Sequence, residues 1–154
     1  MGELLDKSLI EVGVDAENWE DIISYGSDLL LKKGNVKEGY KEKVIEREHQ
    51  FPTGLAGKHM GIAIPHTSAE YTLKPSVCVL IPKKPVAFHA MASEADMIDA
   101  SVVLQLAVKN GDMQLEMLRR VARILQDEEL LAHLMKAKDK QEVIRLLAPI
   151  LEDK

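Results

Sequence analysis

Cysteine is nearly absent from this sequence, since Cys78 is the only one in 154 residues. An internal disulfide is therefore excluded, and a cysteine-rich metal site cannot form. Because Cys78 lies within the apolar run 77–81, we interpret it as a small buried core residue rather than a reactive thiol. The five histidines are scattered without the spacing of metal ligands, so we expect no metal centre.

Long apolar runs are also lacking, and none approaches the ~20 residues of a membrane-spanning helix. Residues 1–14 include acidic side chains and lack the apolar segment of a signal peptide. The net charge is -5, so the excess of positive charge typical of nucleic-acid and anionic-membrane binding is missing. We therefore expect a cytoplasmic protein that binds no nucleic acid and inserts into no membrane.

Motifs for nucleotide binding are missing as well. No Gly-x-x-x-x-Gly-Lys-Ser/Thr loop occurs, so ATP is not the expected phosphoryl source. Gly54, Gly57 and Gly61 do not match the dinucleotide-binding pattern, and we interpret them as turn residues. What is present, 46% hydrophobic and 29% charged residues, is typical of a globular domain. The length fits one domain, which we expect to cover residues 1–154.

The N-terminal third has the pattern of two helices. An apolar stripe over residues 19–30 predicts a helix that Asp15 caps and Gly34 ends. Asn35, at the start of a capping-box pattern, predicts a second helix that runs to about Arg47.

Short apolar runs and later helical spacing complete the predicted fold. Strands are expected at residues 8–12, 62–64, 77–81, 86–88 and 102–108, and residues 51–60 are expected to form an irregular loop. Helices are expected over residues 115–125 and 130–134, and from 143 to 151 after a cap at Asp139. The order of elements predicts an α/β (α+β) fold with a single domain, in which a mixed β-sheet is covered by helices on both sides.

His66 stands out by its context. It follows the apolar strand 62–64 and Pro65, whose ring restricts the backbone before the histidine, and it precedes Thr67 and Ser68. A neutral imidazole nitrogen is a competent nucleophile near pH 7, and the two hydroxyls can bind phosphate oxygens. By chemistry alone, a surface or capping histidine after a strand is still the favoured interpretation.

A resemblance to a known family changes that balance. The stretch Gly-Ile-Ala-Ile-Pro-His at residues 61–66 resembles the phosphorylation site of enzyme IIA components of the bacterial phosphotransferase system, in the mannitol–fructose superfamily. The stretch 47–55 together with 63–67 is most similar to the galactitol-type branch. The resemblance covers nearly the whole chain, with further agreement at residues 83–86, 88–91 and 114–118.

The resemblance implies a role for individual residues. His66 would accept a phosphoryl group from phospho-HPr and pass it to a cysteine of an enzyme IIB. Arg47 would hold the phosphoryl group as a bidentate donor, with the hydroxyls of Thr53 and Thr67 as further phosphate-binding groups. A solvated charge at a helix end is an equally good interpretation of Arg47, and a turn hydroxyl is the alternative for Thr53. No cofactor is implied.

The sequence departs from the family pattern at Gln114. Mannitol and fructose relatives carry a second histidine there, near the start of the helix after the last strand. A glutamine amide can donate a hydrogen bond to phosphate but cannot act as an imidazolium. Charge stabilisation must then come from elsewhere, and Arg47 and His89 are candidates, with Ser68 as possible support. His89 is more often a structural hydrogen-bonding residue.

We expect the His66 ring to be reachable by solvent and by a partner's phosphoryl group. A backbone carbonyl or a hydroxyl should orient its other nitrogen. An apolar rim for partner docking would include Ile64, Leu55, Met91 and Met113, although core packing is the alternative for each of them.

Two other functions stay open beside the sugar-transport phosphocarrier. One is a regulatory enzyme IIA-like sensor that controls another protein and transports no sugar. The other is a binding module that keeps the fold without the chemistry. The sugar itself is not encoded here, and a galactitol-like or related polyol follows only from the branch that the sequence resembles.

Overall fold

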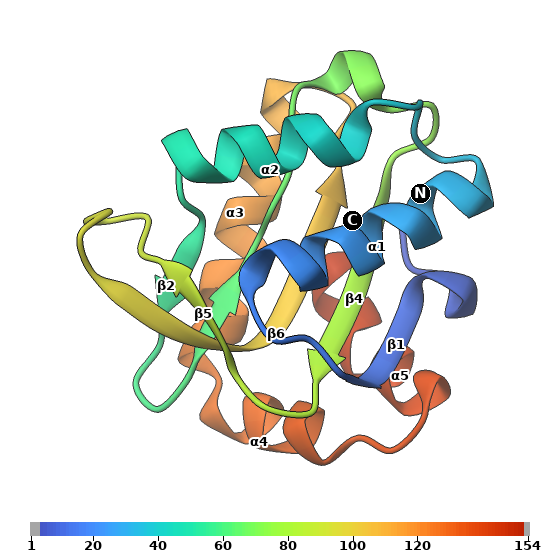
Figure 1. The fold of residues 1–154 in the computed structure, drawn as a ribbon. Coiled ribbons are helices and arrows are strands. Elements are labelled where there is room, and N and C mark those ends of the chain that lie inside the picture. The colour runs from blue at the N-terminus through green and yellow to red at the C-terminus, as the bar shows by residue number, and fades with distance from the viewer. Residues whose placement is uncertain (1–3, 153–154) are drawn as a thin grey trace.

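The computed structural model describes residues 4–152 of the chain. A six-stranded mixed sheet lies between two layers of helices (Figure 1). This confirms the predicted mixed sheet with helices on both sides. Residues 1–3 and 153–154, which the prediction includes in the domain, lie outside the described residues.

The sheet has the order β1-β4-β6-β3-β2, with β5 paired to β6 outside this path. Its strands are β1 (Ile10–Val14), β2 (Gly54–Ala56), β3 (Gly61–Ala63), β4 (Ser76–Pro82), β5 (Val86–His89) and β6 (Met97–Ala107). The helices are α1 (Trp19–Lys33), α2 (Tyr40–Gln50), α3 (Gly111–Gln126), α4 (Glu128–Lys136) and α5 (Lys140–Leu151), with short 3-10 turns at Lys7–Leu9 and Ala69–Tyr71.

The long strand β6 organises the sheet. β4 pairs antiparallel with its C-terminal half and β5 with its N-terminal half, while β3 runs parallel to it on the other side. Beyond β3 the backbone stays beside β6, because the Leu106 N–H donates to the Pro65 carbonyl at 2.9 Å. The residues that follow β3 are therefore held at the sheet rather than in a free loop.

Each face of the sheet has its own core. Because alternate residues of a strand point to opposite faces, Val77 and Val79 pack with α3, α4 and α5, whereas Cys78 and Leu80 pack beneath α1 and α2. Burial raises the pKa of the Cys78 thiol far above its usual range. The interpretation of Cys78 as a buried core residue is confirmed.

The start of α1 differs from the prediction. Asn18, not Asp15, caps the helix, and its side chain accepts a hydrogen bond from the Asp21 N–H at 2.9 Å. Asn18 immediately precedes the first helical residue, where a short side-chain oxygen can reach the free N–H groups. The predicted end at Gly34 is confirmed, because this residue adopts the left-handed conformation after the last turn.

The predicted cap of α2 at Asn35 is wrong. The Asn35 carbonyl accepts hydrogen bonds from the N–H groups of Leu73 and Lys74, which places it in a loop that precedes the helix. α2 begins only at Tyr40, after Gly39 with φ of 96°, and continues to Gln50 rather than Arg47. Long-range backbone pairing therefore outweighs the local capping pattern.

One strand was not predicted, and the start of another was predicted too late in the chain. The expected loop 51–60 contains β2, which pairs antiparallel with β3. β6 begins at Met97 rather than at residue 102, because its polar first part pairs with β5 and lacks the apolar signal of a buried strand. The expected cap at Asp139 is confirmed by its hydrogen bond from the Glu142 N–H.

Candidate functional site

The backbone beside His66 selects which ring nitrogen is free. Nδ1 lies 2.8 Å from the Ile64 carbonyl oxygen. A carbonyl oxygen only accepts, so Nδ1 carries the proton and the neutral ring keeps its lone pair on Nε2. Nε2 is buried and has no hydrogen-bond partner within residues 4–152. The expectation that a backbone carbonyl or a hydroxyl orients the ring is confirmed.

The expectation that solvent reaches the His66 ring is wrong for this structure. His66 is only 6% exposed, because its side chain folds back onto the carbonyl of the strand end. Burial lowers the pKa of His66, and the nearby positive charge of Arg47 lowers it further, against the Ile64 hydrogen bond. The imidazole is therefore neutral at pH 7, which is the state that a nucleophile requires.

Arg47 comes from the last turn of α2. Its side chain is half-buried, and its Nε is buried without a hydrogen-bond partner among the described residues. The guanidinium carbon lies 5.3 Å from the centre of the exposed Phe51 ring, a cation–π distance. In the part of the chain that the structure describes, no carboxylate lies within ion-pair distance of Arg47. Its donors are therefore available to an anion.

Thr53 is buried and its hydroxyl is fully used. The hydroxyl donates to the Glu48 carboxylate at 2.9 Å and accepts from the Ile64 N–H at 3.2 Å. A threonine hydroxyl has one proton, so it would have to leave Glu48 before it could donate to a phosphate oxygen. The structure thus brings Thr53 next to the Ile64 backbone and directs its hydroxyl proton to Glu48.

Glu48 is the residue that the sequence argument missed. It is 3% exposed and also accepts a hydrogen bond from the Thr53 N–H at 2.8 Å. Burial raises its pKa to about 7, although the Thr53 hydrogen bonds and the charges of His89 and Arg47 lower it. A signal exists in the sequence, because Glu48 follows Tyr40 and Val44 at helical spacing, and these three are the buried residues of α2.

The other predicted site residues lie at different distances from this arrangement. Thr67 is buried directly after His66. Ser68 is exposed and donates to the Glu70 carboxylate at 3.2 Å. Gln114 is half-buried in the first turn of α3. His89 is half-buried, and its Nδ1 lies 2.9 Å from the Glu94 carbonyl. Within residues 4–152, none of these side chains forms a hydrogen bond with the His66 ring.

The four expected rim residues separate into two groups. Ile64, Leu55 and Met113 pack with the core on the α3–α5 face, so the core-packing alternative applies to them. Met91 is exposed, and its N–H donates to the Gly54 carbonyl at 2.8 Å, next to Thr53.

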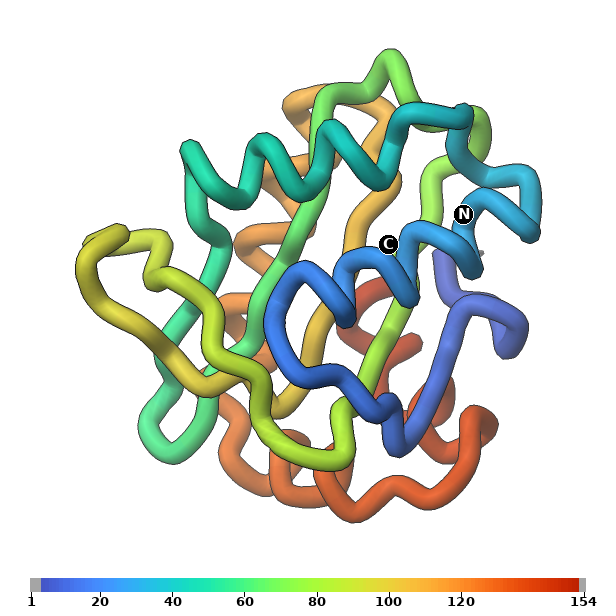
Figure 2. Tube along the Cα trace, in the orientation of Figure 1, coloured from blue at the N-terminus to red at the C-terminus, as the bar shows by residue number. Residues whose placement is uncertain are grey.

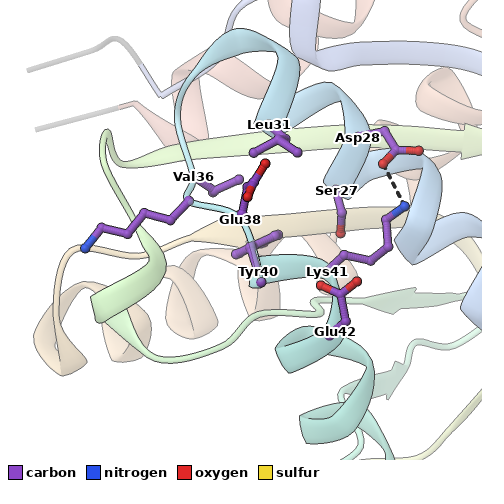
Figure 3. A pocket seen from close by; sticks show the side chains of 10 residues that line it. Ser27, Asp28, Leu31, Val36, Glu38, Tyr40, Lys41 and Glu42 are labelled. Atoms are coloured by element: carbon purple, nitrogen blue, oxygen red, sulfur yellow. Dashed lines mark ion pairs between the residues drawn. The ribbon is translucent and has the colours of Figure 1, made fainter.

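A separate pocket of about 380 Å³ lies between α1 and α2 (Figure 3). Asp28 and Lys41 form an ion pair of 2.7 Å at its edge, and none of its ten described lining residues is a histidine or a cysteine. Among residues 4–152 there is no group of three side chains suited to holding a metal ion. None of the described helices is long and apolar enough to span a membrane.

Comparison with protein families matches residues 3–149 to the model described as "Phosphoenolpyruvate-dependent sugar phosphotransferase system, EIIA 2". The chain is 28% identical to the galactitol-specific EIIA component of Escherichia coli K12, over 82% of this chain and 83% of that protein. It is also 28% identical to the fructose-specific EIIABC component of Bacillus subtilis, over 94% of this chain. The chain spans only 22% of that second relative.

A solved structure extends the likeness to three dimensions. Enzyme IIAMTL of E. coli, in its complex with phosphorylated enzyme IIBMTL, superposes with a TM-score of 0.76 and 26% identity. The superposition covers 94% of this chain and 96% of that one.

Proposed function

The chain belongs to the EIIA 2 family of the phosphoenolpyruvate-dependent sugar phosphotransferase system and is therefore a phosphotransferase, and from this premise we propose that His66 carries the phosphoryl group. It accepts the group from phospho-HPr and passes it to a cysteine of an enzyme IIB, in the cytoplasm. The observation that carries this proposal is the single unpaired ring nitrogen of His66, which the Ile64 carbonyl fixes as the nucleophilic one.

The transfer uses the Nε2 lone pair. Nε2 attacks the phosphorus in line as the donor's P–N bond breaks, and the bonding electrons return to the donor imidazole. The Nδ1 proton stays on the ring, which becomes positively charged as the new N–P bond forms. The Nδ1–H to Ile64 carbonyl hydrogen bond then becomes charge-assisted and stronger, so it favours the transition state over the ground state.

Arg47 is the group that stabilises the transferred phosphoryl oxygens in this proposal. Its charge already acts on the His66 ring, and it has no ion-pair partner among the described residues. A planar guanidinium can donate two parallel hydrogen bonds to a phosphoryl group. Thr67, the next residue in the chain, and Gln114 bring no charge, so Arg47 carries most of the electrostatic stabilisation.

Access to Nε2 requires a side chain to move. Rotation of the His66 ring itself would break the Ile64 hydrogen bond and lose the selected tautomer. Within the described residues the Arg47 side chain forms no hydrogen bond, so its displacement breaks none and gives up the contact with Phe51. We infer that Arg47, whose charge acts on the His66 ring, changes its side-chain conformation to bind the incoming phosphoryl group.

The partners and the sugar follow from the relatives. The likeness to a galactitol-specific EIIA component supports a galactitol-like or related polyol. The likeness to an enzyme IIA that was solved with a phosphorylated enzyme IIB supports such a protein as the acceptor.

The test is phosphorylation with phosphoenolpyruvate, enzyme I and HPr, followed by intact-mass spectrometry. The wild type should gain one acid-labile phosphate, and His66→Ala should gain none. His133→Ala is the matched control, because His133 is an exposed histidine of α4 and should leave labelling unchanged. Equal labelling of the wild type and His66→Ala would move the site elsewhere. Labelling without onward transfer to any enzyme IIB would favour the regulatory sensor.

A further inference from the structure

We propose that Glu48 is a positioning residue for the His66 ring, acting through the Thr53 hydroxyl and the backbone of Ile64. The inference rests on the proposed phosphoryl transfer at His66. It concerns how the reactive nitrogen is selected, because the Ile64 carbonyl that selects it lies beyond the end of the sheet ladders and needs support from outside the motif.

A continuous set of hydrogen bonds joins the carboxylate to the ring. Both Glu48 oxygens are engaged by Thr53, one by its N–H at 2.8 Å and the other by its hydroxyl at 2.9 Å. The Thr53 oxygen accepts the Ile64 N–H at 3.2 Å, and the Ile64 carbonyl accepts from the ring at 2.8 Å. Every polar group between the carboxylate and the imidazole has a partner.

The Thr53 hydroxyl binds the backbone just beyond the last residue that the sheet ladders hold. The ladders of β3 with β2 and with β6 both end at Ala63, one residue before Ile64. Pro65 follows and has no N–H of its own to donate. The direction of the Ile64 carbonyl therefore depends on the hydrogen bond that its N–H makes with Thr53 and on the Pro65 carbonyl contact with Leu106.

Glu48 in turn fixes the rotation of the Thr53 hydroxyl. A hydroxyl rotates freely unless its proton has an acceptor. When the Thr53 hydroxyl proton points at Glu48, a lone pair on the oxygen is left to accept from the Ile64 N–H. The carboxylate is buried on the inner face of α2, where such a group is retained only if it is paired. Figure 2 shows the chain leaving α2, passing through β2 and returning through β3, and the hydrogen bond between the Ile64 N–H and the Thr53 hydroxyl joins the two ends of this segment.

The consequence concerns the tautomer. If the Ile64 carbonyl turns away, Nδ1 loses its acceptor and the neutral ring populates both tautomers. The fraction with a free Nε2 lone pair falls, and the charge-assisted hydrogen bond of the transition state weakens. The rate of transfer at saturating donor should fall, while the affinity for the donor protein should not.

The experiment compares Thr53→Val, which keeps the shape but removes the hydroxyl, with Thr53→Ser, which keeps the hydroxyl. Nitrogen-15 NMR of His66 reports its tautomer without any phosphoryl donor. The wild type should show one Nδ1–H tautomer, and Thr53→Val a mixture. Thr53→Val should also lower kcat for phosphorylation by phospho-HPr on the order of tenfold with KM unchanged, and Thr53→Ser should restore both readouts. Glu48→Gln should change both in the same direction, by less.

Ser27→Ala is the matched control. It removes a buried hydrogen bond between two side chains, Gln105 Nε2 to Ser27 Oγ at 2.8 Å, that lies outside the set described above. It should leave the tautomer and kcat unchanged.

Three outcomes would overturn the inference. These are a single Nδ1–H tautomer in Thr53→Val, a fall in kcat without a change of tautomer, or an equal effect of Ser27→Ala. If Thr53→Val does not fold, the same comparison is made with Glu48→Gln. Failure of the wild type to become phosphorylated would instead reject the proposed function, and the tautomer measurement would still stand.

Discussion

The two sides of the His66 ring differ in how completely their polar atoms are paired. On the Nδ1 side, the ring, the Ile64 backbone, Thr53 and Glu48 satisfy one another. On the unpaired side, Nε2 is buried without a partner among the described residues, and so is the Nε of Arg47, whose charge acts on the ring. Unpaired buried polar atoms are costly and rare, and two of the three in the described residues belong to the His66 ring and to an arginine whose charge acts on that ring. Under the proposed function, the paired side holds the ring and the unpaired side receives the phosphoryl group.

The third buried side-chain atom without a hydrogen-bond partner in residues 4–152 is Gln105 Oε1, and its surroundings differ from those of His66 and Arg47. Gln105 Oε1 faces the backbone of α1 so closely that a Cβ added to Gly26 would clash with it. Its amide nitrogen already donates to Ser27. A single unpaired oxygen enclosed by a helix lacks the complementary pair of nucleophile and donor that His66 and Arg47 provide.

The largest effect that we expect is on the free energy of unfolding, and it comes from Glu48 on the paired side. Burial raises the pKa of Glu48 from 4.5 in the unfolded chain to about 7 in the fold, so the folded protein binds the proton more tightly. The stabilisation is complete below pH 4.5 and is lost as the pH rises through about 7. Relative to Glu48→Gln, the wild-type free energy of unfolding should fall by about 3 kcal/mol over this range. Urea unfolding at several pH values measures it, and a constant difference between the two proteins would contradict the raised pKa.

The next effect belongs to the unpaired side. Arg47→Ala should slow phosphorylation by phospho-HPr on the order of a hundredfold, because a charged donor to the transferred oxygens is lost. The fold should stay intact, since within the described chain Arg47 makes no hydrogen bond or ion pair through its side chain. Arg47→Lys should recover only part of the rate, because an ammonium lacks the bidentate geometry. An unchanged rate in Arg47→Ala would leave Arg47 as a solvated charge.

A smaller effect is expected in the pH dependence of the ring. Because burial and then the Arg47 charge lower the pKa of His66, its NMR titration midpoint should lie below 6.5. Arg47→Met keeps the bulk and removes the charge, so the midpoint should rise while staying below 6.5. A wild-type midpoint above 6.5 would mean that the ring is solvated or paired with an acid.

The smallest effect is expected at Ser68. Ser68 is exposed, and its hydroxyl donates to Glu70 rather than to the His66 ring. Ser68→Ala should therefore change the phosphorylation rate by less than about twofold, in line with surface substitutions outside special contacts. A tenfold loss of the phosphorylation rate would instead show that Ser68 takes part in the transfer.

The sequence predicts those parts of the molecule whose cause is local. The spacing of Trp19 to Leu30, the glycine at position 34 and the apolar runs of β3 and β4 each depend on near neighbours, and the structure contains all of them. The cap at Asn35 was wrong because distant backbone at Leu73 and Lys74 competes for the same loop.

The paired side of the site could not be predicted in the same way. A glutamate at the end of a charged helix is usually solvated, and its burial depends on the hairpin that returns beneath α2. The tautomer of His66 depends on the direction of a single carbonyl, which residue spacing does not encode. The motif identifies the histidine, and only the tertiary arrangement tells its two nitrogens apart.

Helix α2 supplies three separate contributions to this region. Tyr40 donates through its hydroxyl to the Leu106 carbonyl at 2.7 Å, beside the Pro65 contact, while Arg47 and Glu48 come from the last turns. Grafting the six-residue motif alone onto another scaffold would transplant an imidazole with no preference between its nitrogens. The smallest transferable module is instead the uninterrupted stretch from Tyr40 to His66 together with the strand on which it rests.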